Sequence, residues 1–428
     1  MAPSHARLVS SMIVATLVAA ACTAAAPSTP EAAPAAPSSS TITLATASPT
    51  AAATPVTPSP TPTPTPLATD EPTPEHTIGS WALETTLPEF RVGDLVAARD
   101  LVIAVGCKPA SEFGDCVRAT IEVSTAGEWA QAQVENAKGE IFLDAVAADA
   151  DGFVAVGVER GPGLDSFGVL TSTAASFAST DGLIWRRAPD QESLHGRRMN
   201  DVVARPDGGW IAVGSKSVAL NYEGFETWSS ADGLAWKLVG SIPDVGVQGV
   251  ASYRDGLISW GDACGHTCGP VPVIIWTSTD GREWDRVSDQ PSLASARFGG
   301  IVGLSNGALA VGSQWRADGS GVGTTWLSKD AATWPPKALP DSREFDSFQL
   351  VTGAAGFVAV GRLATREDGP WNTWISEDGA TWKRLPDAEL AAGDSPRFLG
   401  GALSADGASF ISAGRSATGS AVFRLWIK

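Results

Sequence analysis

The chain has 428 residues, of which 47 are acidic and 30 basic, for a formal net charge of −17. This length allows two or three domains or one large all-β domain. An acidic surface repels nucleic-acid phosphates and anionic lipid head groups, so we expect no nucleic-acid partner. We expect instead a ligand that is neutral, cationic or bound through a local basic patch.

Residues 1–21 have the features of an export signal. Arg7 precedes an apolar run, Leu8 to Ala21, that is too short to span a membrane as a helix. The run ends in LVAAAC, which resembles the lipobox of bacterial lipoproteins, although Ala19 stands where leucine is more usual. The resemblance implies lipid on Cys22 and a membrane-anchored protein outside the cytoplasm. An ordinary A-x-A cleavage site that precedes a cysteine is the alternative.

Residues 22–77 are predicted to form an extended tether. The segment includes PVTPSPTPTPTPLATDEPTP and has almost no large apolar residues, so it cannot bury a core. At roughly 3 Å per residue where it is polyproline-like, it could hold a domain on the order of 100 Å from a membrane. Its Ser and Thr residues are candidates for glycosylation.

A repeated box organises residues 78–428. Five segments with the pattern S-x-D-x-x-x-W, four of them with Gly after the Asp, lie about 50 residues apart and end at Trp185, Trp236, Trp284, Trp334 and Trp382. A degenerate copy, STAGEW, ends at Trp129. Repeats of about 40–50 residues are typical of propeller blades.

The segments between the boxes predict the strands of each blade. A β-rich run ending in glycine occurs seven times, at Gly106, Gly157, Gly214, Gly261, Gly312, Gly361 and Gly414. A tight turn and another apolar run precede each of these segments. Each unit therefore reads as strand A, turn, strand B, long loop, strand C, box and strand D, and seven such units predict seven blades.

The two ends of the repeat region predict how the ring closes. The last unit stops at FRLWIK, after strand C, without a box or a strand D. The segment GSWALETTL supplies the missing piece, with Trp81 one repeat before Trp129. We therefore predict an all-β fold, a seven-bladed β-propeller of four-stranded blades, closed by an N-terminal strand that completes the last blade.

The box resembles the Asp-box (BNR) repeat of sialidase-like propellers. Its aspartates are Asp181, Asp232, Asp280, Asp330 and Asp378. Because the box recurs evenly around a ring, we expect a structural role: the carboxylate accepts backbone N–H bonds in the C–D turn and the tryptophan packs between sheets. Ala126 replaces the aspartate in the first box and Ala331 the glycine in the fifth, so these two hairpins should be weaker.

Four cysteines follow Cys22, in two close pairs. In an exported chain, an even number of cysteines favours disulfides, here Cys107 with Cys116 and Cys264 with Cys268. The sequence CGHTC lacks the second ligand pair that a zinc site needs, so we expect no metal and no cofactor.

Positions near the start of the innermost strand A are the candidate ligand site. Counting back from the seven glycines places these residues at equivalent positions: Asp94, Asp144, Asp201, Gly249, Gly300, Gln349 and Gly401. About three residues earlier stand Arg91, Arg198, Arg297 and Arg397. We interpret the two sets as a polar funnel that binds a sugar, a peptide end or a cation. Alternatively, the aspartates cap the backbones of neighbouring blades and the arginines pair with them.

Sialidase chemistry is not expected, because it uses a tyrosine nucleophile activated by glutamate. The two tyrosines, Tyr222 and Tyr253, fall on a peripheral loop and on the opposite rim. We expect a monomeric, surface-anchored protein whose propeller binds a glycan or a protein, or acts as an assembly factor, without catalysis. The rival is a glycan-active hydrolase that uses Asp94, Asp144 or Asp201.

Overall fold

The computed structural model describes residues 79–111, 115–164, 170–218, 221–262, 272–343, 345–363, 371–386, 397–406, 409–415 and 419–427. All of them fall within one compact unit, Pro72–Lys428. Two short 3-10 helices, η1 (Glu192–Leu194) and η2 (Pro291–Leu293), accompany the strands. Neither of these helices has the length or the apolar character needed to cross a bilayer.

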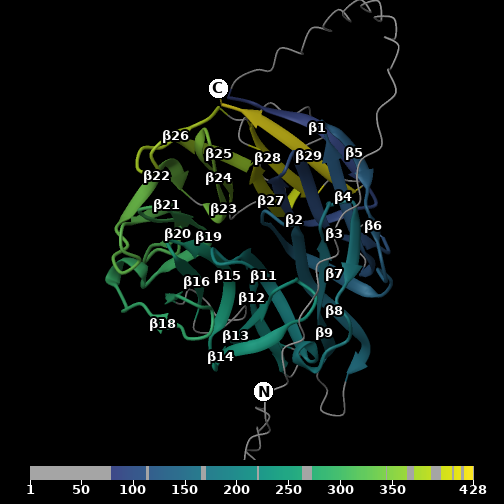
Figure 1. Ribbon diagram of the computed structural model, residues 1–428. Helices are drawn as coiled ribbons and strands as arrows, with labels where there is room; N and C mark the ends of the chain where they lie inside the picture. Colours follow the sequence, from purple (N-terminus) through teal and green to yellow (C-terminus); the bar gives the residue numbers. More distant parts are fainter. Residues whose placement is uncertain are drawn as a thin grey trace, which may run out of the picture. The chain divides into compact units, whose positions relative to one another are not determined.

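The strands form seven sheets around a central axis, and this is the predicted seven-bladed β-propeller (Figure 1). Blade 1 contains β2 (Arg91–Ala98), β3 (Leu101–Pro109), β4 (Cys116–Thr125) and β5 (Glu128–Gln131). Blade 2 contains β7 (Glu140–Ala148), β8 (Phe153–Leu164), β9 (Leu170–Ser179) and β10 (Ile184–Arg187). Blade 3 contains β11 (Arg197–Ala204), β12 (Trp210–Val218), β13 (Asn221–Ser230) and β14 (Lys237–Ile242).

The remaining blades follow the same order. Blade 4 contains β15 (Gly246–Tyr253), β16 (Gly256–Asp262), β17 (Val273–Ser278) and β18 (Asp285–Arg286). Blade 5 contains β19 (Ala296–Leu304), β20 (Gly307–Trp315), β21 (Gly321–Ser328) and β22 (Pro336–Arg343). Blade 6 contains β23 (Phe345–Gly353), β24 (Gly356–Leu363), β25 (Trp371–Ser376) and β26 (Lys383–Arg384). Blade 7 contains β27 (Arg397–Ala405), β28 (Ser409–Arg415), β29 (Gly419–Trp426) and β1 (Trp81–Pro88).

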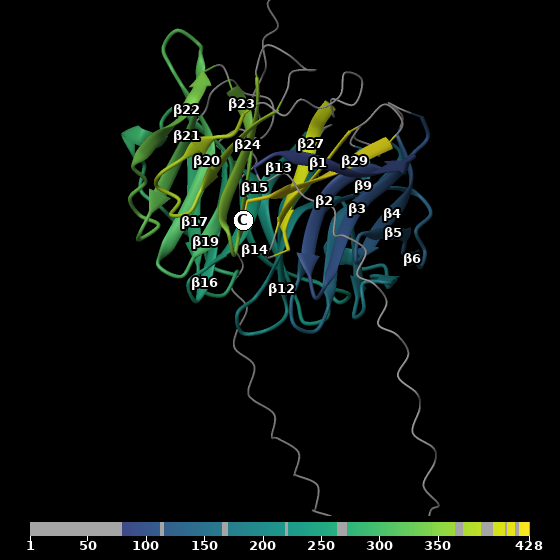
Figure 2. The same cartoon turned by 90° about the horizontal axis from the view of Figure 1, so that it is seen from above.

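The first strand of each blade lines the central channel, because each of these strands packs against the first strand of the next blade. Seen edge-on, the strands run across the ring between two rims (Figure 2). We call the rim where the first strands begin the upper rim; in blade 1 it carries Arg91 and Pro109. The lower rim carries the tight A–B turns and the boxes, represented in blade 1 by Ala98 and Thr125.

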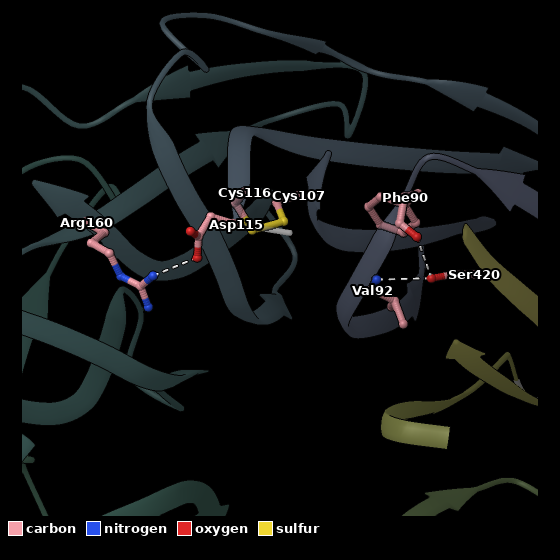
Figure 3. Close-up of a disulfide and its surroundings, with 7 residues drawn as sticks. All are labelled: Phe90, Val92, Cys107, Asp115, Cys116, Arg160 and Ser420. Carbon is pink, nitrogen blue, oxygen red and sulfur yellow. Dashed lines mark hydrogen bonds and ion pairs between the residues drawn. A yellow bond between two sulfur atoms is a disulfide. The ribbon is translucent and has the colours of Figure 1, made fainter. Parts of the chain in front are cut away.

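The N-terminal strand closes the ring as predicted. Strand β1 pairs antiparallel with β29, from Trp81 opposite Leu425 to Pro88 opposite Gly419, and the two strands lie side by side in Figure 1. The Ser420 hydroxyl links the closing blade to blade 1: it accepts the Val92 N–H at 3.1 Å and donates to the Phe90 carbonyl at 2.8 Å (Figure 3). Closure packs the innermost strand of blade 7, β27, against the innermost strand of blade 1, β2, and so completes the ring.

Blade 2 differs from the prediction of four strands. A short fifth strand, β6 (Gln133–Val134), pairs in parallel with the outer strand β10, with Gln133 opposite Ile184. The D–A connection of blade 1 supplies this strand before it enters blade 2. An outer strand of this propeller can therefore accept a further strand.

The apolar core is divided among the seams between blades. Each seam holds a cluster of buried side chains drawn from two neighbouring blades. In the seam between blades 4 and 5, for example, the rings of Phe298 and Trp326 lie 4.8 Å apart. Such a ring is stabilised mainly by nearest-neighbour interfaces, so each seam contributes separately to stability.

Candidate functional site

The candidate site lies at the upper part of the channel, where the first strands carry β-bulges. In blades 1 and 3 the residue after the bulge is an aspartate, Asp94 opposite Val105 and Asp201 opposite Val213. In blade 2 the bulged residue itself is Asp144, and Ala145 takes the position equivalent to Asp94. The predicted equivalence of the three aspartates is therefore wrong for Asp144, which lies one residue too early.

Asp94 and Asp201 each bond to the backbone of the next blade. Asp94 Oδ2 accepts the Val146 N–H at 2.9 Å, and Asp201 Oδ2 accepts the Val250 N–H at 2.8 Å. Gly249 makes the second contact possible, because a Cβ there would lie 2.9 Å from Asp201 Oδ2. These two carboxylates link neighbouring blades, as the alternative interpretation of the sequence proposed.

Asp144 has a different environment. It forms an ion pair with Arg198 of blade 3, and its side chain is 10% exposed. Its second oxygen, Oδ2, is buried and has no hydrogen-bond partner among the residues described. The Arg91 guanidinium lies 5.0 Å from the centroid of the Phe142 ring, and its charge partly offsets the rise that burial causes in the pKa of Asp144. The channel thus brings Arg91, Asp144 and Arg198 together, and the ion pair between Asp144 and Arg198 is of the kind that the alternative interpretation predicted.

Burial dominates the proton affinity of the channel carboxyls. It raises the pKa of both Asp94 and Asp201 to about 7, against the opposing effect of the backbone N–H groups that they accept. The negative charges of Asp201 and Asp144 raise the pKa of Asp94 further. Burial also raises the pKa of Asp144, although Arg198 opposes that change. Both carboxyls therefore bind a proton more tightly than an exposed aspartate does.

The other predicted funnel residues are spread around the channel. The Arg297 side chain, at the start of β19, is exposed. Gln349 is half-buried, and its Oε1 has no hydrogen-bond partner among the described residues. Arg397 begins β27, and its side chain lies outside the described residues. Gly401 lies one residue before Ala402, which pairs with Ala413 and takes the position equivalent to Asp94.

The boxes form hydrogen-bonded turns on the lower rim. Asp181 Oδ1 accepts the N–H groups of Leu183 at 2.8 Å and Ile184 at 3.0 Å. The corresponding pairs of bonds are made by Asp232, Asp280, Asp330 and Asp378. These N–H groups lower the pKa of the aspartates, to about 2 for Asp378. The carboxylates therefore stabilise the turns, and they lie on the rim opposite the funnel.

One predicted disulfide is confirmed. Cys107 and Cys116 are bonded, with their Cα atoms 5.7 Å apart, and the bond joins β3 to β4 at the upper rim (Figure 3). An ion pair between Arg160 and Asp115, at 2.8 Å, ties the same region to blade 2. The second predicted pair, Cys264 with Cys268, and the predicted lipid site Cys22 lie outside the described residues.

The arrangement offers no sialidase-like nucleophile in the part of the chain that is described. Tyr253 ends β15 on the lower rim and is buried, and burial raises its pKa. The side chain of Tyr222 lies outside the described residues. Among the described residues, no cluster of three or more His, Cys, Asp or Glu side chains has a geometry suited to a metal ion.

A charged cluster that the sequence did not reveal lies on the lower rim, where blade 7 meets blade 1. Arg424 Nε donates to Glu84 Oε2 at 2.5 Å, and Arg424 also pairs with Asp406. The cluster borders a cavity of about 970 Å³. The signal that could have found it is the shortened box STAGEW, which faces this seam.

No protein-family model matches the chain, and neither does any curated protein. Among solved structures, YCF48 bound to a D1 peptide is similar at a TM-score of 0.52 and 12% identity, over 83% of this chain and 96% of that one. The likeness to YCF48 shows a shared propeller fold.

Two glycosidase structures are similar at lower scores. A Trypanosoma rangeli sialidase complex has a TM-score of 0.45 and 10% identity, over 79% of this chain and 54% of that one. The GH74 xyloglucanase from Xanthomonas campestris has a TM-score of 0.48 and 16% identity, with the same two coverages.

Proposed function

We propose that this chain is a lipid-anchored extracytoplasmic protein whose propeller binds a protein segment or a glycan at the upper rim without catalysis. The observation that carries the proposal is the engagement of the channel carboxylates. Asp94 and Asp201 accept N–H groups from neighbouring blades, and Asp144 pairs with Arg198. A glycosidase instead needs two carboxyl groups that face one shared substrate volume.

Exposed basic groups at the channel mouth support ligand binding. Arg91 and Arg297 are exposed at the starts of β2 and β19, and the Arg198 side chain is 31% exposed. Guanidinium groups can bind carboxylates or sugar hydroxyls with defined geometry. The fold is compatible with a peptide ligand, since YCF48 bound to the D1 peptide has a similar propeller.

The proposed anchor is compatible with a ligand at the upper rim. Strand β1 begins at Trp81, opposite Leu425, on the lower rim. A tether formed by residues 22–77 would continue into the propeller at the strand that begins on that side. Lipid on Cys22 would then keep the binding face near the cell surface.

A glycan-active hydrolase is the second candidate, because Asp94 and Asp201 have pKa values of about 7. A carboxyl group that is protonated near neutral pH can act as a general acid. In this reaction class one of Asp94, Asp144 and Asp201 would protonate the leaving-group oxygen, and another would act as the base or nucleophile.

Binding of the purified chain to an array of bacterial and host glycans, together with crosslinking on intact cells, tests the proposal. The informative variant is Arg297→Ala on the upper rim, and its matched control is Arg282→Ala, an exposed arginine in a lower-rim box. Glycan binding or protein crosslinks that only Arg297→Ala removes would support the proposal. Glycan turnover that Asp201→Asn abolishes would favour the hydrolase, and the absence of binding, crosslinks and turnover would overturn both.

A further inference from the structure

The seam between blades 7 and 1 contains a cavity on the lower rim. Its volume is about 970 Å³, and the A–B turns of both blades, the start of β1, the end of β29 and the box of blade 1 line it. The corresponding place between blades 2 and 3, where the box is intact, has a cavity of about 430 Å³. A volume of 300–1,000 Å³ is typical of ligand sites.

Two features account for the extra space: the box of blade 1 is shortened, and no box joins β29 to β1 in blade 7. Ala126 and Gly127, with φ of 51° and 90°, form a two-residue turn that joins Thr125 directly to Glu128. Two residues at positive φ are typical of a tight hairpin turn that matches the twist of its strands. This turn is one residue shorter than an intact box and therefore lacks the loop that the other boxes extend towards the preceding blade.

Intact boxes fill their seams with that loop. A Cβ added at Gly182 would lie 2.8 Å from Leu101 and 3.1 Å from Ile103 of the preceding blade. A Cβ added at Gly127 would meet nothing within 4 Å. The space that a box occupies elsewhere is thus open at the seam between blades 7 and 1.

The tryptophan of the shortened box bonds differently from the others. In an intact box, the indole N–H donates to a carbonyl of its own turn, as Trp185 does to Gly182 at 2.8 Å. Trp129 instead donates to Glu84 Oε1 of β1 at 2.8 Å. The Trp129 indole therefore ties blade 1 to the closing strand.

Carboxylates outnumber cations on the polar wall of the cavity. Glu84 and Asp406 are 13% and 28% exposed, and both pair with Arg424. Asp100 is exposed and also lines the cavity. The neighbouring Arg99 is directed to blade 2, where it donates to the Thr180 carbonyl at 2.9 Å. The wall therefore presents three carboxylates against two guanidinium groups, those of Arg99 and Arg424, and its net negative charge attracts a cation.

Apolar groups and a strand edge complete the cavity. Leu83 is 47% exposed, and Trp426 lies beside it on the lining. Strand β1 is the outer strand of blade 7, and no strand among the described residues pairs with its outer edge, whereas the outer strand β10 of blade 2 pairs with β6. Exposed strand edges can bind extended peptides through main-chain hydrogen bonds, while nearby pockets take alternate side chains.

We propose that this seam cavity binds a cationic peptide segment in an extended conformation. A Lys or Arg side chain of the peptide lies against Asp100 and Asp406, and apolar neighbours in the peptide pack against Leu83 and Trp426. The site lies on the rim opposite the funnel, so this proposal goes beyond the proposed function and does not depend on it.

The test measures binding of the full chain to a labelled Leu-Lys-Leu-Lys-Leu peptide by fluorescence anisotropy, with Leu-Glu-Leu-Glu-Leu as the reference peptide. Asp100→Asn removes a carboxylate at the cavity, and Asp151→Asn removes one from the matching turn of blade 2, which borders the smaller cavity. A third variant replaces residues 124–129 by the seven-residue box of residues 179–185, which should fill the cavity. Measurements at 0.15 M salt suppress charge attraction beyond about 8 Å.

The proposal predicts saturable binding of the lysine peptide but not of the glutamate peptide. Asp100→Asn should weaken binding by about fivefold, the effect of one partly exposed ion pair. Asp151→Asn should leave binding unchanged, and the box replacement should abolish it. Absence of saturable binding to the natural chain, or equal weakening by Asp100→Asn and Asp151→Asn, would overturn the proposal. The comparison of these two exposed positions remains decisive if the box replacement fails to fold.

Discussion

Replacing Asp201 with asparagine should change the pH dependence of stability in a defined direction. Folding raises the pKa of Asp201 from about 3.9 in an unfolded chain to about 7. The folded chain therefore binds this proton more tightly than the unfolded chain does. The stabilisation from protonated Asp201 is fully present below the pKa of this carboxyl in the unfolded chain, and it is lost as the pH rises through its pKa in the folded chain.

The size of the effect follows from the two pKa values. Between pH 5 and pH 8, the linkage relation gives a loss of about 3 kcal/mol from this single carboxyl. Asparagine does not titrate, so the variant should lack that loss. Asp201 Oδ1 accepts the Val202 N–H and Oδ2 accepts the Val250 N–H, whereas the side chain of asparagine has only one oxygen that can accept. Asp201→Asn should therefore be about 1 kcal/mol less stable at pH 5 and about 2 kcal/mol more stable at pH 8.

Urea unfolding followed by tryptophan fluorescence at pH 5, 6, 7 and 8 would measure the difference between the two proteins. Buried tryptophans in the seams, such as Trp228 and Trp276, make fluorescence a suitable signal. Asp151→Asn, on an exposed turn, is the matched control and should follow the natural chain at every pH. Parallel stability curves for Asp201→Asn and the natural chain would refute the assignment of Asp201 as a carboxyl with a raised pKa.

Three further predictions concern the structural elements of the ring. Cys107→Ser should lower the free energy of unfolding by about 3 kcal/mol, because the disulfide closes a loop of about ten residues. Equal stability of the natural chain with and without reductant would contradict this contribution of the disulfide. Trp185→Ala should lower the free energy of unfolding by about 3–5 kcal/mol, whereas Trp129→Ala, at a partly buried position, should lower it by less. Urea unfolding of the two variants measures both losses, and equal losses would contradict the difference between intact and shortened boxes. Asp378→Ala should cost about 1 kcal/mol at pH 7. Because turn N–H groups lower the pKa of Asp378 to about 2, this cost should shrink as the pH falls from 4 to 2, and a constant cost would contradict it.

The period of the boxes and of the strand-B glycines was sufficient to predict the blades. Each blade must bury both faces of a small sheet against its neighbours, so one apolar pattern recurs seven times along the chain. Trp81 extended that period to the N-terminus and predicted the pairing of β1 with β29. These features depend on local patterns that repeat at a fixed spacing, and such patterns are visible without coordinates.

The environment of the channel aspartates could be predicted only in part. The sequence placed Asp94, Asp144 and Asp201 on innermost strands, but it could not place the bulge in each strand. One residue of register separates Asp144, which faces Arg198, from Asp201, which accepts the Val250 N–H. Register depends on hydrogen bonds between strands, and a single residue reverses the side to which a side chain points.

The sequence alone determined the number of blades, the order of their strands and the way the ring closes, because repeated local patterns encode them. The tertiary structure alone decided which carboxylates bond across seams and where a cavity opens. Glu84 and Arg424 lie at opposite ends of the chain, and Trp129 meets Glu84 only after the ring closes. The shortened box marks where this cavity opens, but the size of the cavity depends on the distance between two blades, which no local pattern specifies.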